Sequence, residues 1–116
     1  MSGTLNDLCD NIHADNVTAG WWDGPMTPLV VATKIALIHS EISEALEGFR
    51  KDLPDAHLPH RRNAEVELAD ALIRVFDLAG AHGFDMDGAV AEKRAYNVTR
   101  RDHKAAARAG SGGKKY

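Results

Sequence analysis

Acidic residues at helical spacing inside an apolar stretch constrain the fold of this chain more than any other feature. Glu41 and Glu44 lie three residues apart within the strongly apolar segment 28–49, and Glu67 and Asp70 repeat the spacing. On a helix, residues three apart share a face. Unpaired carboxylates cost several kcal/mol each to bury against Ile and Leu. Two facing helices would therefore form a four-carboxylate cluster that a divalent cation, bound through oxygen, neutralises.

The composition indicates a single all-α domain. The chain has 116 residues and shows little of the alternation of β-branched residues that is typical of strands. Its formal net charge of −3 is small, so neither nucleic acid nor a membrane surface is an expected partner. No apolar run is long enough to cross a bilayer, and the first residues do not resemble a signal peptide. Cys9 is the only cysteine, which fits a reducing, cytoplasmic setting.

The first half of the chain predicts two helices. Apolar residues at helical spacing indicate a helix over about 4–16, with Thr4 as its N-cap. Thr27 followed by Pro28 is a strong helix start, and this second helix should run to about residue 50 or 51. It is apolar around most of its circumference, which calls for burial on several sides. In so short a chain, we expect other subunits to supply part of that cover.

The second half predicts two further helices and a tail, which gives a bundle of four to five helices. The third helix should cover about 63–81, with Gly83 at its C-terminal cap. The fourth should cover about 86–100, capped by Asp85 or Asp87. From residue 104 the chain is basic and rich in glycine. We therefore expect a domain over 1–103 and a C-terminal tail over 104–116.

Both tryptophans, Trp21 and Trp22, lie in a loop punctuated by Gly and Pro. They either cover the hydrophobic core, or one of them stacks on a planar ligand such as a nucleobase. Lys34 lies two turns before the first acid of its helix and would either pair with the acids or contact a phosphate. Arg74 lies one turn after Asp70, so it would form an ion pair within its helix or stabilise charge beside a bound triphosphate.

Lys93, Asn97 and Arg100 recur at helical spacing near the end of the predicted domain, with Tyr96 beside them. Two cations, an amide and a phenol on one side of a helix form either an anion-binding surface or an ordinary solvated face.

The acid pairs favour Mg²⁺, with Mn²⁺ as a substitute. Neither pair contains histidine, and all-oxygen ligation disfavours iron and zinc. Magnesium in proteins usually shares its coordination shell with substrate phosphates. An acidic metal cluster facing Lys, Asn and Arg therefore suits a nucleoside triphosphate, with a metal-bound water as nucleophile and one carboxylate as its base.

Four motifs in this order resemble the MazG-like all-α nucleoside triphosphate pyrophosphohydrolases. They lie within about residues 27–103 and read EISEALE at 41–47, ELAD at 67–70, GFDM at 83–86 and KRAYNVTR at 93–100. The resemblance implies a helical core that assembles as a dimer or tetramer. It also implies Mg²⁺-dependent hydrolysis of a (d)NTP to the monophosphate and pyrophosphate, as in nucleotide-pool control. Many members carry two adjacent glutamates in the first motif, whereas Ser40 precedes the first glutamate here. This difference weakens the expectation that the site binds a second metal ion.

The resemblance also assigns roles to residues. The metal ligands would be Glu41, Glu44, Glu67 and Asp70, with Glu44 chosen to orient or deprotonate the water. Lys93 and Asn97, together with Arg100, would contact phosphates or sugar, and Trp22 or Trp21 would hold the base.

Three alternatives stay open. Phosphoribosyl-ATP pyrophosphohydrolase shares the helical superfamily and would be confined to that substrate. A non-catalytic metal- or nucleotide-binding helical module would bind without turnover. A structural helical oligomer would carry solvated acids and show no response to metal.

Overall fold

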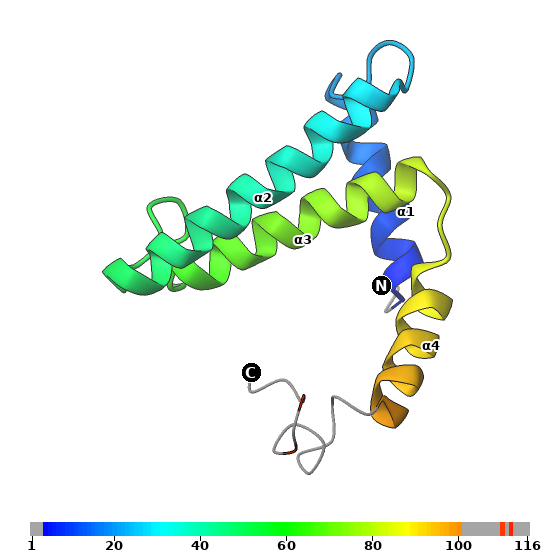
Figure 1. Cartoon of the computed structure of the whole chain (residues 1–116). Coiled ribbons are helices and arrows are strands. Elements are labelled where there is room, and N and C mark those ends of the chain that lie inside the picture. Colours follow the sequence, from blue (N-terminus) through cyan, green and yellow to red (C-terminus); the bar gives the residue numbers. More distant parts are fainter. Residues whose placement is uncertain (1–3, 101–109, 111, 113–116) are drawn as a thin grey trace. The chain divides into compact units, whose positions relative to one another are not determined.

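The computed structural model describes residues 4–100, 110 and 112, and these residues form four α-helices and no strand (Figure 1). The all-α prediction is confirmed. The helices are α1 (Leu5–Thr18), α2 (Pro28–Lys51), α3 (Asn63–Ala81) and α4 (Met86–Thr99). The chain divides into one compact unit up to Phe84 and a second from Asp85 onward. The expected tail, 104–116, lies outside the described residues apart from Gly110 and Gly112.

The helices begin where local capping chemistry predicts. The hydroxyl of Thr4 accepts a hydrogen bond from the backbone N–H of Asp7 at 3.1 Å, which caps α1. The hydroxyl of Thr27 likewise accepts from the N–H of Val30 at 3.2 Å, with proline in the first turn of α2. Asp85, one of two expected caps, fills this role for α4. These contacts satisfy backbone donors that the first turn of a helix leaves unpaired.

Within the first unit, α3 packs against both α2 and α1. Figure 1 shows α2 and α3 running side by side in opposite directions, while α1 crosses the C-terminal end of α3. Among the described residues, the buried apolar side chains are all small: Cys9, Ala45, Ala64, Ala71 and Ala79. The closest contacts between the helices are therefore made by small residues, and no large apolar side chain of the described residues is buried between them.

Two glycines permit the closest approaches between helices. A Cβ on Gly48 of α2 would lie 2.9 Å from the backbone of Ala64, and a Cβ on Gly80 of α3 would overlap the carbonyl oxygen of Cys9. Because neither backbone atom can move aside, both positions require glycine. Close contact here brings side chains on neighbouring helices within reach of one another.

The α2–α3 connection is held by one buried carboxylate. Asp55 accepts hydrogen bonds from the backbone N–H groups of His57 and Leu58, at 3.0 and 2.9 Å, and from the Asn63 amide at 3.0 Å. The hydrogen bond from Leu58 is the main cause that lowers the pKa of Asp55 below its ordinary value, against an opposing effect of burial. The loop thereby fixes how α3 returns along α2.

Candidate functional site

Three of the four predicted metal-binding acids meet between α2 and α3. Carboxylate oxygens of Glu41, Glu67 and Asp70 lie within 4.8 Å of one another. Glu67 and Asp70 share a face of α3 because they are three residues apart. Glu41 reaches them from α2, since the two helices approach along small residues such as Ala45 and Ala71.

Burial and neighbouring negative charges act against ionisation of one acid of the cluster, Glu67. Burial raises the pKa of Glu67 above its ordinary value, and the negative charges of Asp70 and Glu41 raise it further, as does a hydrogen bond with Asp70. Each of these causes disfavours the ionised carboxylate. A cation placed among the three oxygens would reverse that balance, so the donor set fits a hard, oxygen-binding ion such as Mg²⁺.

Glu44 stands apart from the other three acids. It lies one turn beyond Glu41 on α2 and is exposed, and its carboxylate is not part of the set of three. Its charge nevertheless contributes to the raised pKa of Glu67, as the weakest of the causes. Its role as ligand or base stays a prediction.

Arg74 contacts an acid of the neighbouring helix. Its Nε donates a hydrogen bond to Oε1 of Glu41 at 3.1 Å, and the Glu41 side chain is only 18 % exposed. The sequence suggested Asp70, one turn away on the same helix, as the structural partner of Arg74. The pair that forms instead joins α3 to α2, because the helices approach closely at this level.

Two acids of the cluster, Glu41 and Asp70, line a cavity that the cationic side chains of Lys34 and Arg74 also line. It has a volume of about 550 Å³, which lies within the range of small-molecule sites of roughly 300–1,000 Å³. Its walls come from all three helices of the first unit and the tryptophan loop: Asn16, Trp21, Lys34, Leu37, Glu41, Asp70, Ile73, Arg74 and Asp77. Carboxylate and cationic side chains therefore line one space.

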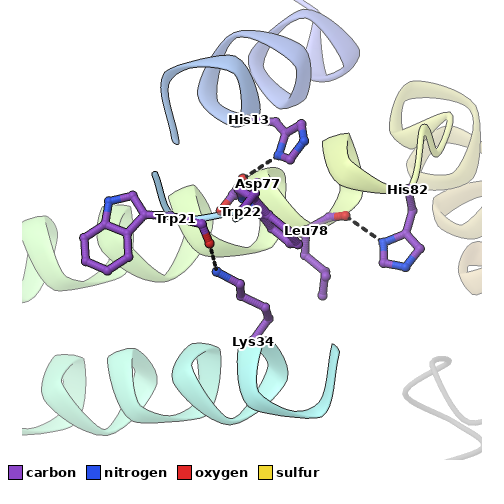
Figure 2. A network of polar contacts seen from close by, with 7 residues as sticks. All are labelled: His13, Trp21, Trp22, Lys34, Asp77, Leu78 and His82. Carbon is purple, nitrogen blue, oxygen red and sulfur yellow. Dashed lines mark hydrogen bonds and ion pairs between the residues drawn. The ribbon is translucent and has the colours of Figure 1, made fainter. Parts of the chain in front are cut away.

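Lys34 faces this cavity without pairing with the acids. Its Nζ donates a hydrogen bond to the carbonyl oxygen of Trp21 at 3.2 Å and lies 4.3 Å from the ring centre of Trp22 (Figure 2). The carbonyl and the aromatic face hold the ammonium in place, and no carboxylate of the described residues pairs with it. Of the two roles suggested for Lys34, the ion pair with the acids does not form in this structure.

Trp22 is anchored by a buried carboxylate that sequence reasoning missed. Its Nε1 donates to Oδ1 of Asp77 at 2.9 Å, and Nδ1 of His13 lies 2.9 Å from the same oxygen. The His13 ring meets the Trp22 ring edge-on, with centroids 5.0 Å apart (Figure 2). Asp77 is 6 % exposed. Asp77 lies two helical turns after Asp70 and so shares its face, but this spacing alone does not indicate Trp22 or His13 as partners.

The two tryptophans differ in exposure and surroundings. Trp21 is 69 % exposed and lines the cavity of the acids. Both tryptophans, with Lys34, also line a second, smaller cavity of about 310 Å³ formed by residues 21–26 and the start of α2. An anchored indole beside an exposed one offers an aromatic surface next to the acids.

The remaining predicted substrate contacts lie on α4 and at its C-cap residue, Arg100, in the second unit. Nζ of Lys93 lies 4.8 Å from the ring centre of Tyr96, and Nη1 of Arg100 donates to Oδ1 of Asn97 at 3.4 Å. These four side chains thus pair along the helix at the predicted spacing. Their contact with substrate stays a prediction.

Comparison with known proteins gives no match: no family model, no curated protein and no solved structure matches this chain. Among the described residues, no helix is long and apolar enough to cross a membrane.

Proposed function

We propose that this chain is a MazG-like, Mg²⁺-dependent nucleoside triphosphate pyrophosphohydrolase that converts a (d)NTP to the monophosphate and pyrophosphate. One observation carries the proposal: Glu41 and Asp70 of the acid cluster line the same cavity as Lys34 and Arg74. A triphosphate with its metal needs both kinds of group, carboxylates for the metal and cations for the phosphate oxygens.

The residues present suit a bound magnesium or manganese ion. Glu41, Glu67 and Asp70 would hold it through their carboxylate oxygens. A cation there would counteract the burial and the neighbouring negative charges that raise the pKa of Glu67. When bound, such an ion neutralises phosphate charge and lowers the pKa of a coordinated water. The absence of histidine from the three-residue set favours these ions over zinc.

The chain's own residues would bind the triphosphate and move one proton. Lys34 and Arg74 attract the phosphate oxygens, and the resemblance to the family assigns Lys93, Asn97 and Arg100 of this chain to phosphates or sugar. Glu44 accepts the proton of the attacking water while the water oxygen forms its bond to phosphorus. The bond between that phosphorus and the oxygen that bridges it to pyrophosphate breaks in line with the attack, and pyrophosphate leaves.

An aromatic surface beside the acids supports a role in holding the base. Trp21 lines the cavity, and Trp22 is fixed through its indole nitrogen. Stacking on either ring would stabilise the bound nucleotide by about 1–3 kcal/mol, whichever base it carries.

We also propose that the protein is a homo-oligomer. Large apolar side chains of α2 and α3 remain exposed, among them Leu29 at 76 %, Phe49 at 64 %, Leu46 at 59 % and Leu72 at 52 %. Only small apolar side chains are fully buried in the described chain. A second copy that covers these helices would supply the larger hydrophobic core that the small residues do not.

The test of the activity is pyrophosphate release from a panel of ribo- and deoxyribonucleoside triphosphates, with Mg²⁺ and with EDTA. We expect metal-dependent turnover, and a loss of roughly 100-fold or more in Asp70→Asn and Glu44→Gln. Glu65→Gln is the matched control, since Glu65 lies on α3 but pairs with Arg61 on the surface. Full activity in both site variants, or metal binding without any turnover, would overturn the proposal.

A further inference from the structure

Among the residues that the structure describes, only one of the two carboxylate oxygens of Asp77 has a hydrogen-bond partner. Both Trp22 and His13 contact Oδ1, at 2.9 Å each. Among the described residues, no buried side-chain nitrogen or oxygen lacks a partner. Oδ2 has no hydrogen-bond partner among the described residues, so it is not fully enclosed, and Asp77 lines the cavity of the acids. An ionised carboxylate oxygen can only accept a hydrogen bond.

Asn16 lines the same cavity as Asp77. It follows His13 by three residues on α1, so the two side chains share the face that meets α3. No hydrogen bond within the described chain uses its side-chain amide, which offers both a donor and an acceptor. Asp77 and Asn16 therefore present an acceptor and an amide to whatever occupies the cavity.

We propose that Asp77 and Asn16 read the base of the nucleotide and select cytosine or adenine over uracil, thymine and guanine. This proposal rests on the nucleotide function proposed above. It adds the class of base and two specificity-determining residues, neither of which is a metal ligand or a phosphate contact.

The selection follows from donor and acceptor patterns. Cytosine and adenine carry an amino group next to a ring nitrogen that accepts hydrogen bonds. The amino group donates to Oδ2 of Asp77, and the ring nitrogen accepts from the amide of Asn16. Uracil and thymine place a carbonyl oxygen where the amino group would be, which sets two acceptors against each other. Guanine does the same with its O6.

The anchoring of Asp77 makes this readout selective. Hydrogen bonds from Trp22 and His13 keep the carboxylate from turning away from a carbonyl group. A site that holds a fixed polar group rejects a base that leaves the group unpaired, and we expect a preference on the order of tenfold to hundredfold. The same indole that Asp77 anchors lies in the loop that we propose for base stacking.

The test measures binding apart from catalysis. The full-length protein is titrated in EDTA with the five nucleoside monophosphates, and binding is read from the fluorescence of the two tryptophans, which both lie at these cavities. We expect CMP and AMP to bind roughly tenfold to hundredfold more tightly than UMP, TMP and GMP. Equal affinity for all five, or no binding of any, overturns the proposal.

Two variants test whether Asp77 and Asn16 set the base preference. Asp77→Asn keeps an oxygen for Trp22 and His13 but turns an amino group toward the cavity, so the preference should shift toward UMP and TMP. Asn16→Ala should weaken CMP and AMP with little effect on UMP. Asp15→Asn, an exposed neighbour on α1, is the control and should bind like the unaltered chain. An unchanged preference in Asp77→Asn and in Asn16→Ala contradicts the assignment.

Pyrophosphate release from the matching triphosphates separates the two proposals. Selective binding of CMP and AMP without turnover of any triphosphate supports the base-reading site and overturns the enzymatic function. Turnover of all triphosphates at equal kcat/KM, with no selective binding, supports the enzyme and overturns base selection.

Discussion

Arg74 on α3 donates a hydrogen bond from Nε to Oε1 of Glu41 on α2, across 3.1 Å. This contact joins the two helices that carry the acid cluster and places a fixed positive charge at its edge. The guanidinium offsets part of the repulsion among Glu41, Glu67 and Asp70, whose oxygens lie within 4.8 Å of one another. It thus stabilises the cluster in the metal-free protein.

Arg74→Ala should destabilise the metal-free protein and should make its stability more dependent on Mg²⁺. Removal of the cation leaves the acids with less compensation, at a cost of roughly 1 kcal/mol for a partly buried pair. Urea denaturation with EDTA and with Mg²⁺ measures the effect. Arg61→Ala, which breaks an exposed pair with Glu65, is the control. Equal losses in the two variants would contradict a role for Arg74 in the cluster.

Glu67→Gln should stabilise the metal-free protein at neutral pH while removing its response to metal. The pKa of Glu67 is raised in the folded state, so its favourable contribution is present below the unfolded pKa and is lost as pH rises through the folded pKa. At neutral pH the ionised group therefore opposes folding, and the amide does not. Thermal unfolding in EDTA against pH, then with added Mg²⁺, tests both parts. A variant that is less stable in EDTA and still gains stability from Mg²⁺ refutes the assignment.

Asp55→Asn should lose stability at neutral pH, and the difference from the unaltered chain should shrink in acid. Hydrogen bonds, first of all from Leu58, lower the pKa of Asp55 in the folded state. Its contribution is therefore present above the unfolded pKa of about 3.9 and is lost as pH falls through the folded pKa. Urea denaturation from about pH 3 to pH 7 follows the difference. The exposed Asp10→Asn should show no such trend, and a constant deficit in Asp55→Asn would exclude the proposed linkage.

Phe49→Glu together with Leu46→Glu should convert the proposed oligomer to a smaller species. Both side chains are exposed on α2, at 64 % and 59 %, and a charge there cannot be buried against a second copy without a large cost. Light scattering during gel filtration measures the mass. Leu58→Glu, an exposed apolar residue in the α2–α3 loop, serves as control and should leave the mass unchanged. A chain that is already monomeric without substitutions would refute the oligomer.

The sequence predicted the helices because their starts depend on neighbours in the chain. The caps Thr4 and Thr27 bind N–H groups only three residues away, and Pro28 pre-sets the first turn. The first helix extends two residues beyond its expected end, and Gly83, with φ of 65°, lies one position after the cap residue of α3. Helix ends lack strong local signals comparable to a threonine–proline start.

The contacts across helices were less predictable from the sequence. Spacing alone paired Glu67 with Asp70, but it could not rank Asp70 against Glu41 as the partner of Arg74. Residues three apart on a helix are separated by about 60° around its axis. That rotation is enough for Glu41 to face α3 while Glu44 stays exposed.

The anchoring of the tryptophan loop was beyond sequence reasoning. Asp77 contacts residues 64 and 55 positions away in the chain, His13 and Trp22. No periodicity links such positions, because their contact depends on how α1 crosses α3 at Gly80. Asp77 lies two turns beyond the ELAD motif. Its position indicates a place in the cavity wall only once the face of α3 that lines the cavity is known.

The most direct test of the central claim is to identify, by ³¹P NMR, the products formed when the full-length protein acts on a nucleoside triphosphate with Mg²⁺. We expect equal amounts of nucleoside monophosphate and pyrophosphate, with no reaction in EDTA or in Asp70→Asn. Formation of the diphosphate and orthophosphate, or hydrolysis that continues in EDTA, would contradict a pyrophosphohydrolase that depends on the cluster of Glu41, Glu67 and Asp70.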